Sequence, residues 1–186
     1  MDDTPRAQFT QFAPAGAPGT FDGHRRRTLQ ALLCGAAGGV WAADAATTLV
    51  PEIALRASDG HAVLGAARNA NWRVTYIDFW ASWCPPCKLS FSWMNQMHEL
   101  LGNKGLRIVA IGLDRKEADA QRFLSQAPAK FPLALNPTGD TAALLNVQAM
   151  PTSFVVSAER RLLYTHRGFR LEDGPELEAR LRAALA

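Results

Sequence analysis

Two cysteines separated by two prolines, Cys84-Pro85-Pro86-Cys87, constrain this sequence more than any other feature. An apolar run from Val74 to Phe79 precedes the pair, and an amphipathic helical pattern over Pro85 to Leu101 follows it. This order predicts a buried strand that turns tightly into a helix. Proline is tolerated in the first turn of a helix, because its missing N–H removes no helical hydrogen bond there. We therefore place Cys84 at the helix N-terminus and Cys87 about one turn further on, close enough for the two sulfurs to form a disulfide.

The predicted position suits thiol–disulfide exchange, in which the attacking species is a thiolate. Unpaired backbone N–H groups and the positive end of the helix dipole favour an anion at Cys84. We predict that Cys84 attacks and that Cys87 resolves. Two other interpretations stay open. A zinc half-site would need further ligands, and only Cys34 and four histidines (24, 61, 98 and 166), with no short-spaced pair, are available. A structural disulfide would gain little chain entropy from so small a ring.

A known family shares this pattern. The run Asp78-Phe79-Trp80-Ala81-Ser82-Trp83-Cys84-Pro85-Pro86-Cys87 resembles the active-site segment of thioredoxin-fold proteins, and Met150-Pro151-Thr152 lies downstream where that family carries a cis-proline. The Trp-Cys-Pro-Pro-Cys version is similar to the extracytoplasmic TlpA/ResA-type thiol–disulfide oxidoreductases. The resemblance implies an α/β, thioredoxin-like fold with a central mixed sheet flanked by helices. It also implies an N-terminal β-hairpin extension, which we place at 53–56 and 61–64.

The resemblance assigns roles to residues around the cysteines. Asp78 matches a buried acid beneath the pair, whose pKa would be raised by desolvation and which could accept the Cys87 proton. A partly solvated carboxylate at a strand end is the alternative for Asp78. Trp83 is expected to cover the turn and to form part of a docking surface, and Pro85 and Pro86 are expected to stiffen the turn.

The segment Met150-Pro151-Thr152 is expected to pack over the cysteine pair. With Pro151 in cis, the Met150 backbone could pair with an extended substrate segment; an ordinary trans turn is the alternative. The helix after the cysteines departs from the family at Ser90 and Ser92, where glutamate and proline are frequent. Spacing of three to four residues predicts that the core-facing side chains of this helix are Leu89, Trp93, Met97 and Leu100.

The N-terminal segments are predicted from composition. Residues 1–23 are rich in Pro, Gly, Ala and Thr and are expected to be disordered. Residues 24–46 combine an arginine cluster, a short apolar core and small residues, which indicates an export signal or membrane-targeting segment of Sec or twin-arginine type; an uncleaved anchor stays open. Lipidation of Cys34 is disfavoured, since the bulky Leu33 precedes it. Residues 47–186 are expected to form the thioredoxin-like domain in a periplasmic or extracytoplasmic setting.

Charge and composition exclude some functions. The formal net charge is only +3, and no basic stripe interleaved with aromatic residues appears, so nucleic-acid binding is not expected. Membrane contact is expected only through the N-terminal segment. No cofactor is expected beyond the redox-active disulfide, and no metal.

The expected function is that of a protein-disulfide reductase. Its clients would be exported proteins with disulfides or paired thiols, such as apocytochrome c haem-binding thiols (cytochrome c maturation) or copper-site cysteines. An extracytoplasmic electron donor would re-reduce it, and the net direction depends on reduction potential. A copper chaperone of the same fold is one alternative, although such proteins usually place three residues between their cysteines. A non-catalytic binding module is the other.

Overall fold

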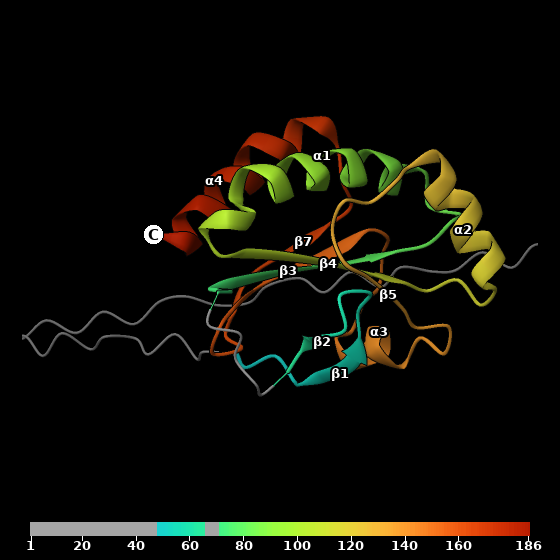
Figure 1. Cartoon of the computed structure of the whole chain (residues 1–186), viewed down its shortest axis with the longest axis horizontal. Coiled ribbons are helices and arrows are strands. Elements are labelled where there is room, and N and C mark those ends of the chain that lie inside the picture. The colour runs from blue at the N-terminus through green and yellow to red at the C-terminus, as the bar shows by residue number, and fades with distance from the viewer. Residues whose placement is uncertain (1–47, 66–70) are drawn as a thin grey trace, which may run out of the picture. The chain divides into compact units, whose positions relative to one another are not determined.

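The structure is a computed structural model that describes residues 48–65 and 71–186 (Figure 1). The segments predicted as disordered (1–23) and as an export signal (24–46, with Cys34) lie outside these residues. Across the two described ranges, no helix is both long enough and apolar enough to cross a bilayer.

A mixed sheet of five strands, in the order β5-β4-β3-β6-β7, forms the centre of the fold. The strands are β3 (Val74–Trp80), β4 (Leu106–Gly112), β5 (Leu133–Leu135), β6 (Thr152–Ser157) and β7 (Leu162–Arg167). β3 and β4 run parallel, while β6 runs antiparallel to both β3 and β7. Every residue of β3 and β4 is buried. Burial on both faces explains why these strands are nearly continuous apolar runs in the sequence.

Helices and a hairpin cover the two faces of the sheet (Figure 1). The helices are α1 (Pro85–Leu101), α2 (Glu117–Gln126), α3 (Asp140–Leu144) and α4 (Gly174–Leu185), with the 3₁₀ turns η1 (Gly102–Lys104) and η2 (Leu171–Asp173). Side chains of α1, α2 and α4 share one hydrophobic core with one face of the sheet. The hairpin of β1 (Ile53–Arg56) and β2 (Ala62–Leu64) shares a second core with α3 and the opposite face. The predicted thioredoxin-like fold with an N-terminal hairpin is confirmed.

The buried face of α1 differs from the predicted one. Trp93 and Met97 are buried as expected, but Leu89 and Leu100 are 42% and 51% exposed. The residues that α1 buries are Cys87, Ser90, Phe91, Trp93, Met94, Met97 and Leu101. This set follows the 3.6-residue period when the count starts at Cys87. The predicted face was counted from Leu89 and is therefore rotated partly away from the core, so that only Trp93 and Met97 of its four residues are buried.

Arg107 fastens the hairpin to the sheet. Its guanidinium donates to the Asp59 carboxylate at 3.0 and 3.1 Å and to the carbonyl oxygens of Ala62 and Val63 at 2.7 and 2.9 Å. The same group lies 4.1 Å from the ring centroid of Trp72. The Arg107 side chain is only 4% exposed, so a buried charge on β4 is satisfied mainly by groups of the hairpin.

Candidate active site

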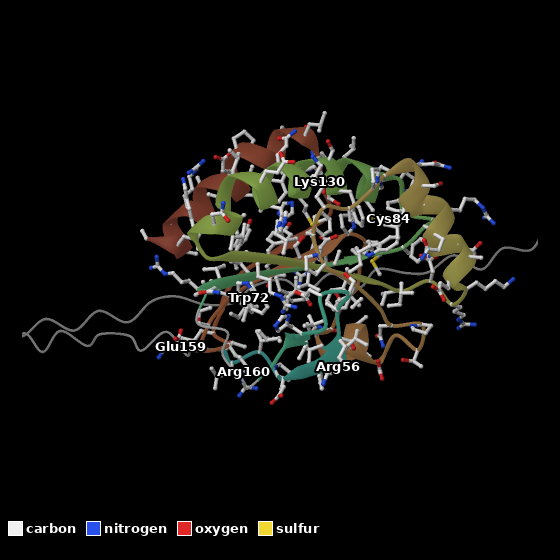
Figure 2. The ribbon with its side chains drawn as sticks, viewed as in Figure 1. Arg56, Trp72, Cys84, Lys130, Glu159 and Arg160 are labelled. Carbon is white, nitrogen blue, oxygen red and sulfur yellow. A yellow bond between two sulfur atoms is a disulfide. The ribbon has the colours of Figure 1, made fainter. Side chains whose placement is uncertain are left out.

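Cys84 and Cys87 form a disulfide at the start of α1, with the sulfurs 2.02 Å apart and the Cα atoms 5.5 Å apart. Cys84 is the N-cap residue of the helix, as predicted, and Cys87 lies in its first turn. Figure 2 labels Cys84 at this end of α1. Cys87 is fully buried, whereas Cys84 is 3% exposed and its neighbour Trp83 is 68% exposed. The small exposure that the pair retains therefore belongs to Cys84.

The two prolines alter the electrostatics expected at Cys84. Pro85 and Pro86 occupy the first two helical positions and carry no N–H. The next N–H, of Cys87, donates to the Cys84 carbonyl oxygen at 3.1 Å. The unpaired backbone donors predicted to stabilise a Cys84 thiolate are thus absent from this described turn, because two of them are replaced by proline and the third is engaged. The helix dipole remains to favour an anion there.

A pair of hydrogen bonds holds the loop between β3 and α1. The Ser82 N–H and hydroxyl donate to the two carboxylate oxygens of Asp114 at 2.9 and 2.7 Å. Asp114 is 6% exposed. Trp80 pairs with Gly112 where the parallel strands β3 and β4 end. Ser82 lies two positions after Trp80, and Asp114 lies two positions after Gly112. Sequence reasoning missed the contact between Ser82 and Asp114. The signal that could have revealed it was the register of the two parallel strands.

Trp80 is a core residue at the end of β3. Its fully buried ring lies 5.1 Å from Phe91 and 4.7 Å from Phe123, measured between centroids. A Cβ placed on Gly112 would meet the Trp80 ring and the Leu135 side chain, each at 3.0 Å. Glycine at this position therefore leaves room for the indole that supports the end of β3.

Asp78 is fully buried on β3. Strand alternation places it on the same face as Tyr76 and Trp80, whose side chains share a core with both cysteines. Burial raises the pKa of Asp78 to about 7, although a hydrogen bond from Ser153 acts in the opposite direction. The partly solvated carboxylate considered as the alternative is therefore wrong.

Sequence reasoning missed the partners of Asp78. The Ser153 hydroxyl donates to Asp78 Oδ1 at 2.7 Å, and Tyr76 Oη donates to Ser153 Oγ at 2.7 Å. Ser153 is the register partner of Asp78 across β3 and β6. Burial and the neighbouring Asp78 raise the pKa of the Tyr76 hydroxyl. The signal lay in the alternation of β3, which puts two polar residues on a face otherwise made of core side chains.

The Met150–Pro151 peptide bond is cis, as the resemblance implied, and the trans alternative does not hold. Thr152 opens β6 opposite Phe79, so Pro151 lies at the same end of the sheet as the loop that carries the cysteines. Met150 is half-buried and packs against the core that contains both cysteines. The Gly168 N–H donates to the Pro151 carbonyl oxygen at 2.7 Å, which ties this loop to the end of β7.

Within residues 48–65 and 71–186, no three His, Cys, Asp or Glu side chains gather as a candidate ligand set. His166 Nε2 lies 3.3 Å from Asp173 Oδ2, on β7 and η2 respectively.

Comparisons with known proteins agree with this geometry. A model of the Redoxin family matches residues 45–181. The thiol-disulfide oxidoreductase ResA of Bacillus subtilis is 25% identical over 97 residues, which are 52% of this chain and 54% of that protein. A thiol:disulfide interchange protein DsbE homolog of Paracoccus denitrificans is 34% identical over 119 residues, which are 59% of this chain and 63% of that protein. The chain spans about half the length of the ResA relatives that it matches.

A solved structure has the same fold as this chain. The crystal structure of a protein assigned as thiol:disulfide interchange protein DsbE, from Chlorobium tepidum, has a TM-score of 0.67 and 41% identity. The match covers 75% of this chain and 97% of that one.

Proposed function

Because this chain belongs to the Redoxin family, we propose that it is a thiol–disulfide oxidoreductase whose working group is the Cys84–Cys87 pair. The observation that supports this most is the disulfide at the first turn of α1, where Cys84 keeps the exposure and Cys87 is enclosed. The relatives named ResA and DsbE support the same class of reaction. The proposed direction is reduction of disulfides in client proteins.

The reaction takes two exchange steps. The Cys84 thiolate attacks one sulfur of a client disulfide, so that a Cys84–client bond forms and the other client sulfur leaves as a thiolate. Cys87 then attacks the Cys84 sulfur, the internal disulfide forms, and the second client sulfur leaves. Two electrons pass from the dithiol to the client. A dithiol donor restores the reduced pair by the same steps in reverse.

Asp78 is proposed as the base for the second step. Cys87 is fully buried, and its thiol must lose a proton before it attacks. Asp78 lies on the sheet face that carries the cysteine core, and its pKa of about 7 suits a group that accepts a proton near neutral pH. The proton moves from the Cys87 sulfur to an Asp78 carboxylate oxygen and is later lost to solvent.

Client recognition is proposed to use the surface beside Cys84. Trp83 offers an exposed indole next to the attacking sulfur, and the Met150 backbone before the cis-proline would pair with an extended client strand. The proposed clients are exported proteins with disulfides or paired thiols, including haem-binding and copper-site cysteines. The pattern of residues 24–46 supports an extracytoplasmic location.

A stoichiometric thiol assay tests the reductase function. The full-length protein is reduced, freed of reductant and mixed with insulin as a disulfide substrate. Intact-mass spectrometry should show loss of two hydrogens from the protein for each insulin disulfide that gains two hydrogens. A Cys84→Ala variant should transfer no electrons, and a Cys87→Ala variant should stop at a covalent adduct. Full transfer by Cys84→Ala would overturn the assignment, and a complete lack of transfer by the wild-type protein would favour a non-catalytic module.

A further inference from the structure

A chain of two hydrogen bonds lies behind the proposed base. Tyr76 Oη and Ser153 Oγ are 2.7 Å apart, and Ser153 Oγ and Asp78 Oδ1 are also 2.7 Å apart. Tyr76 and Asp78 are fully buried and Ser153 is 3% exposed. A serine hydroxyl has a single proton to donate. Because Tyr76 donates to the Ser153 oxygen, the Ser153 proton is directed to Asp78.

The second oxygen of Asp78 is left open. Among the described residues, Asp78 Oδ2 is buried and has no hydrogen-bond partner. An unpaired buried oxygen is costly, and such groups in native proteins are often tied to function. With Oδ1 held by Ser153, Oδ2 is the oxygen that can take a proton arriving from the cysteine side of the sheet.

We propose that Ser153 and Tyr76 are positioning residues that orient the Asp78 carboxylate and tune its readiness to accept the Cys87 proton during resolution of the mixed disulfide. This rests on the proposed function. In this step the proton leaves the Cys87 sulfur for Asp78 Oδ2, and the Cys87–Cys84 bond forms while the Cys84–client bond breaks. The client sulfur departs with the electron pair of the broken bond.

The other titratable groups around Asp78 do not take the place of Ser153 and Tyr76 as its hydrogen-bonding neighbours. On β4 the register partner of Asp78 is Ala110, which carries no titratable group. From β7, Tyr164 acts on the Tyr76 hydroxyl, and His166 lies one strand further out, opposite Ser153. From α1 both cysteines belong to the hydrophobic core on the same face of the sheet. Only Ser153 donates a side-chain hydrogen bond to Asp78 among the described residues.

Loss of the Ser153 hydroxyl should change the pH at which Asp78 accepts a proton in a defined direction. The Ser153 hydrogen bond stabilises the ionised carboxylate and so opposes the rise in the pKa of Asp78 that burial causes. A Ser153→Ala variant should therefore move the inflection in the rate of resolution to higher pH by about one unit. At pH 7 that shift makes resolution about fivefold slower. Tyr76→Phe should shift the inflection in the same direction by less, because the Ser153 proton is then free to rotate away.

The experiment follows the mixed disulfide itself. Reduced full-length protein is mixed with a peptide dimer held by one disulfide, quenched with acid at intervals, and separated by intact mass into reduced, peptide-adducted and internally oxidised forms. The decay rate of the adduct is measured from pH 5 to 9. Ser153→Thr keeps a hydroxyl and should restore the wild-type inflection. Thr75→Val, a matched change of a buried hydroxyl residue on the opposite face of β3, should leave the profile unchanged.

The outcomes separate this inference from the proposed function. If the wild-type protein forms neither adduct nor internal disulfide, the oxidoreductase function itself is wrong. If the wild-type protein resolves normally and Ser153→Ala and Tyr76→Phe both keep its inflection, only the positioning role is overturned. An inflection that survives in Asp78→Asn would also overturn it, since the inflection would then belong to another group. Should Ser153→Ala fail to fold, a Tyr76→Phe profile identical to wild type overturns the proposal by itself.

Discussion

Replacing Asp78 by asparagine removes a carboxyl group that the native fold encloses completely. Burial raises the pKa of Asp78 from 3.8 to about 7, so the native state holds its proton more tightly than the unfolded chain does. Well below pH 3.8 the carboxyl group is protonated in both states and does not change the free energy of unfolding. As the pH rises from about 4 to 7, the unfolded chain ionises first, and the free energy of unfolding of the wild-type protein falls.

The magnitude follows from the two pKa values. A pKa rise from 3.8 to about 7 lowers the free energy of unfolding by about 4 kcal/mol once the carboxyl group is ionised in both states, at 1.36 kcal/mol per pKa unit. Between pH 5 and pH 8 the loss is about 3 kcal/mol by the same relation. The asparagine side chain does not titrate, so the Asp78→Asn variant lacks this loss. Changes in packing or hydrogen bonding caused by the substitution are the same at each pH and cancel in the comparison.

The assay is urea unfolding of both proteins with the disulfide closed, so that the cysteines do not titrate. At about 2 kcal/mol per molar urea, the difference between the two midpoints should change by more than about 1 M between pH 5 and pH 8, in favour of Asp78→Asn at the higher pH. The matched control is Glu99→Gln, which changes an exposed carboxylate on α1 and should show no loss of this sign. Parallel pH dependences for wild type and Asp78→Asn would refute the assignment of a raised pKa to Asp78.

Three further substitutions test the contacts that position the cysteine loop and that hold the N-terminal hairpin on the sheet. Gly112→Ala should lower the free energy of unfolding by about 1 to 3 kcal/mol in urea titrations, because the new methyl group presses on the Trp80 ring; wild-type stability would contradict the close contact. Asp114→Ala should speed amide hydrogen exchange at Ser82 and lower the free energy of unfolding by about 2 kcal/mol, because both hydrogen bonds from Ser82 are lost. Unchanged exchange would show that these hydrogen bonds do not hold the loop. Arg107→Lys should lower the free energy of unfolding by about 2 kcal/mol in thermal melts, since a lysine cannot reproduce the forked hydrogen bonds of the guanidinium. An unchanged melting temperature would show that these hydrogen bonds do not stabilise the hairpin on the sheet.

Local signals in the sequence were enough to predict the buried strand, the turn at the cysteines and the helix after it, whereas the thioredoxin-like fold was implied by the resemblance to a family. β3 and β4 are buried on both faces, so their apolar runs identify them without knowledge of neighbours. Prolines at the first two helical positions mark the start of α1 at Pro85. The cis-proline was different, because the residues of an X–Pro bond do not determine its isomer, and only the resemblance to a family supported the prediction at Pro151.

Contacts between distant segments could not be predicted in the same way. The hydrogen bonds of Ser153 to Asp78 and of Ser82 to Asp114 join residues 75 and 32 positions apart, and each depends on the register of two strands. The buried face of α1 was misjudged for a different and local reason. Ser90 is polar and short, yet it is 1% exposed with its hydroxyl on the Cys87 carbonyl oxygen, so an apolar stripe alone did not identify the core-facing side.

The proposed function depends on attack by Cys84 and resolution by Cys87. The most direct measurement is to express a Cys87→Ala variant of the full chain, quench cellular thiols with acid and alkylating reagent, and map any mixed disulfides by mass spectrometry. Client peptides should be found joined to Cys84, and a matched Cys84→Ala variant should trap none. Adducts on Cys87 in the Cys84→Ala variant, together with none on Cys84 in the Cys87→Ala variant, would contradict it.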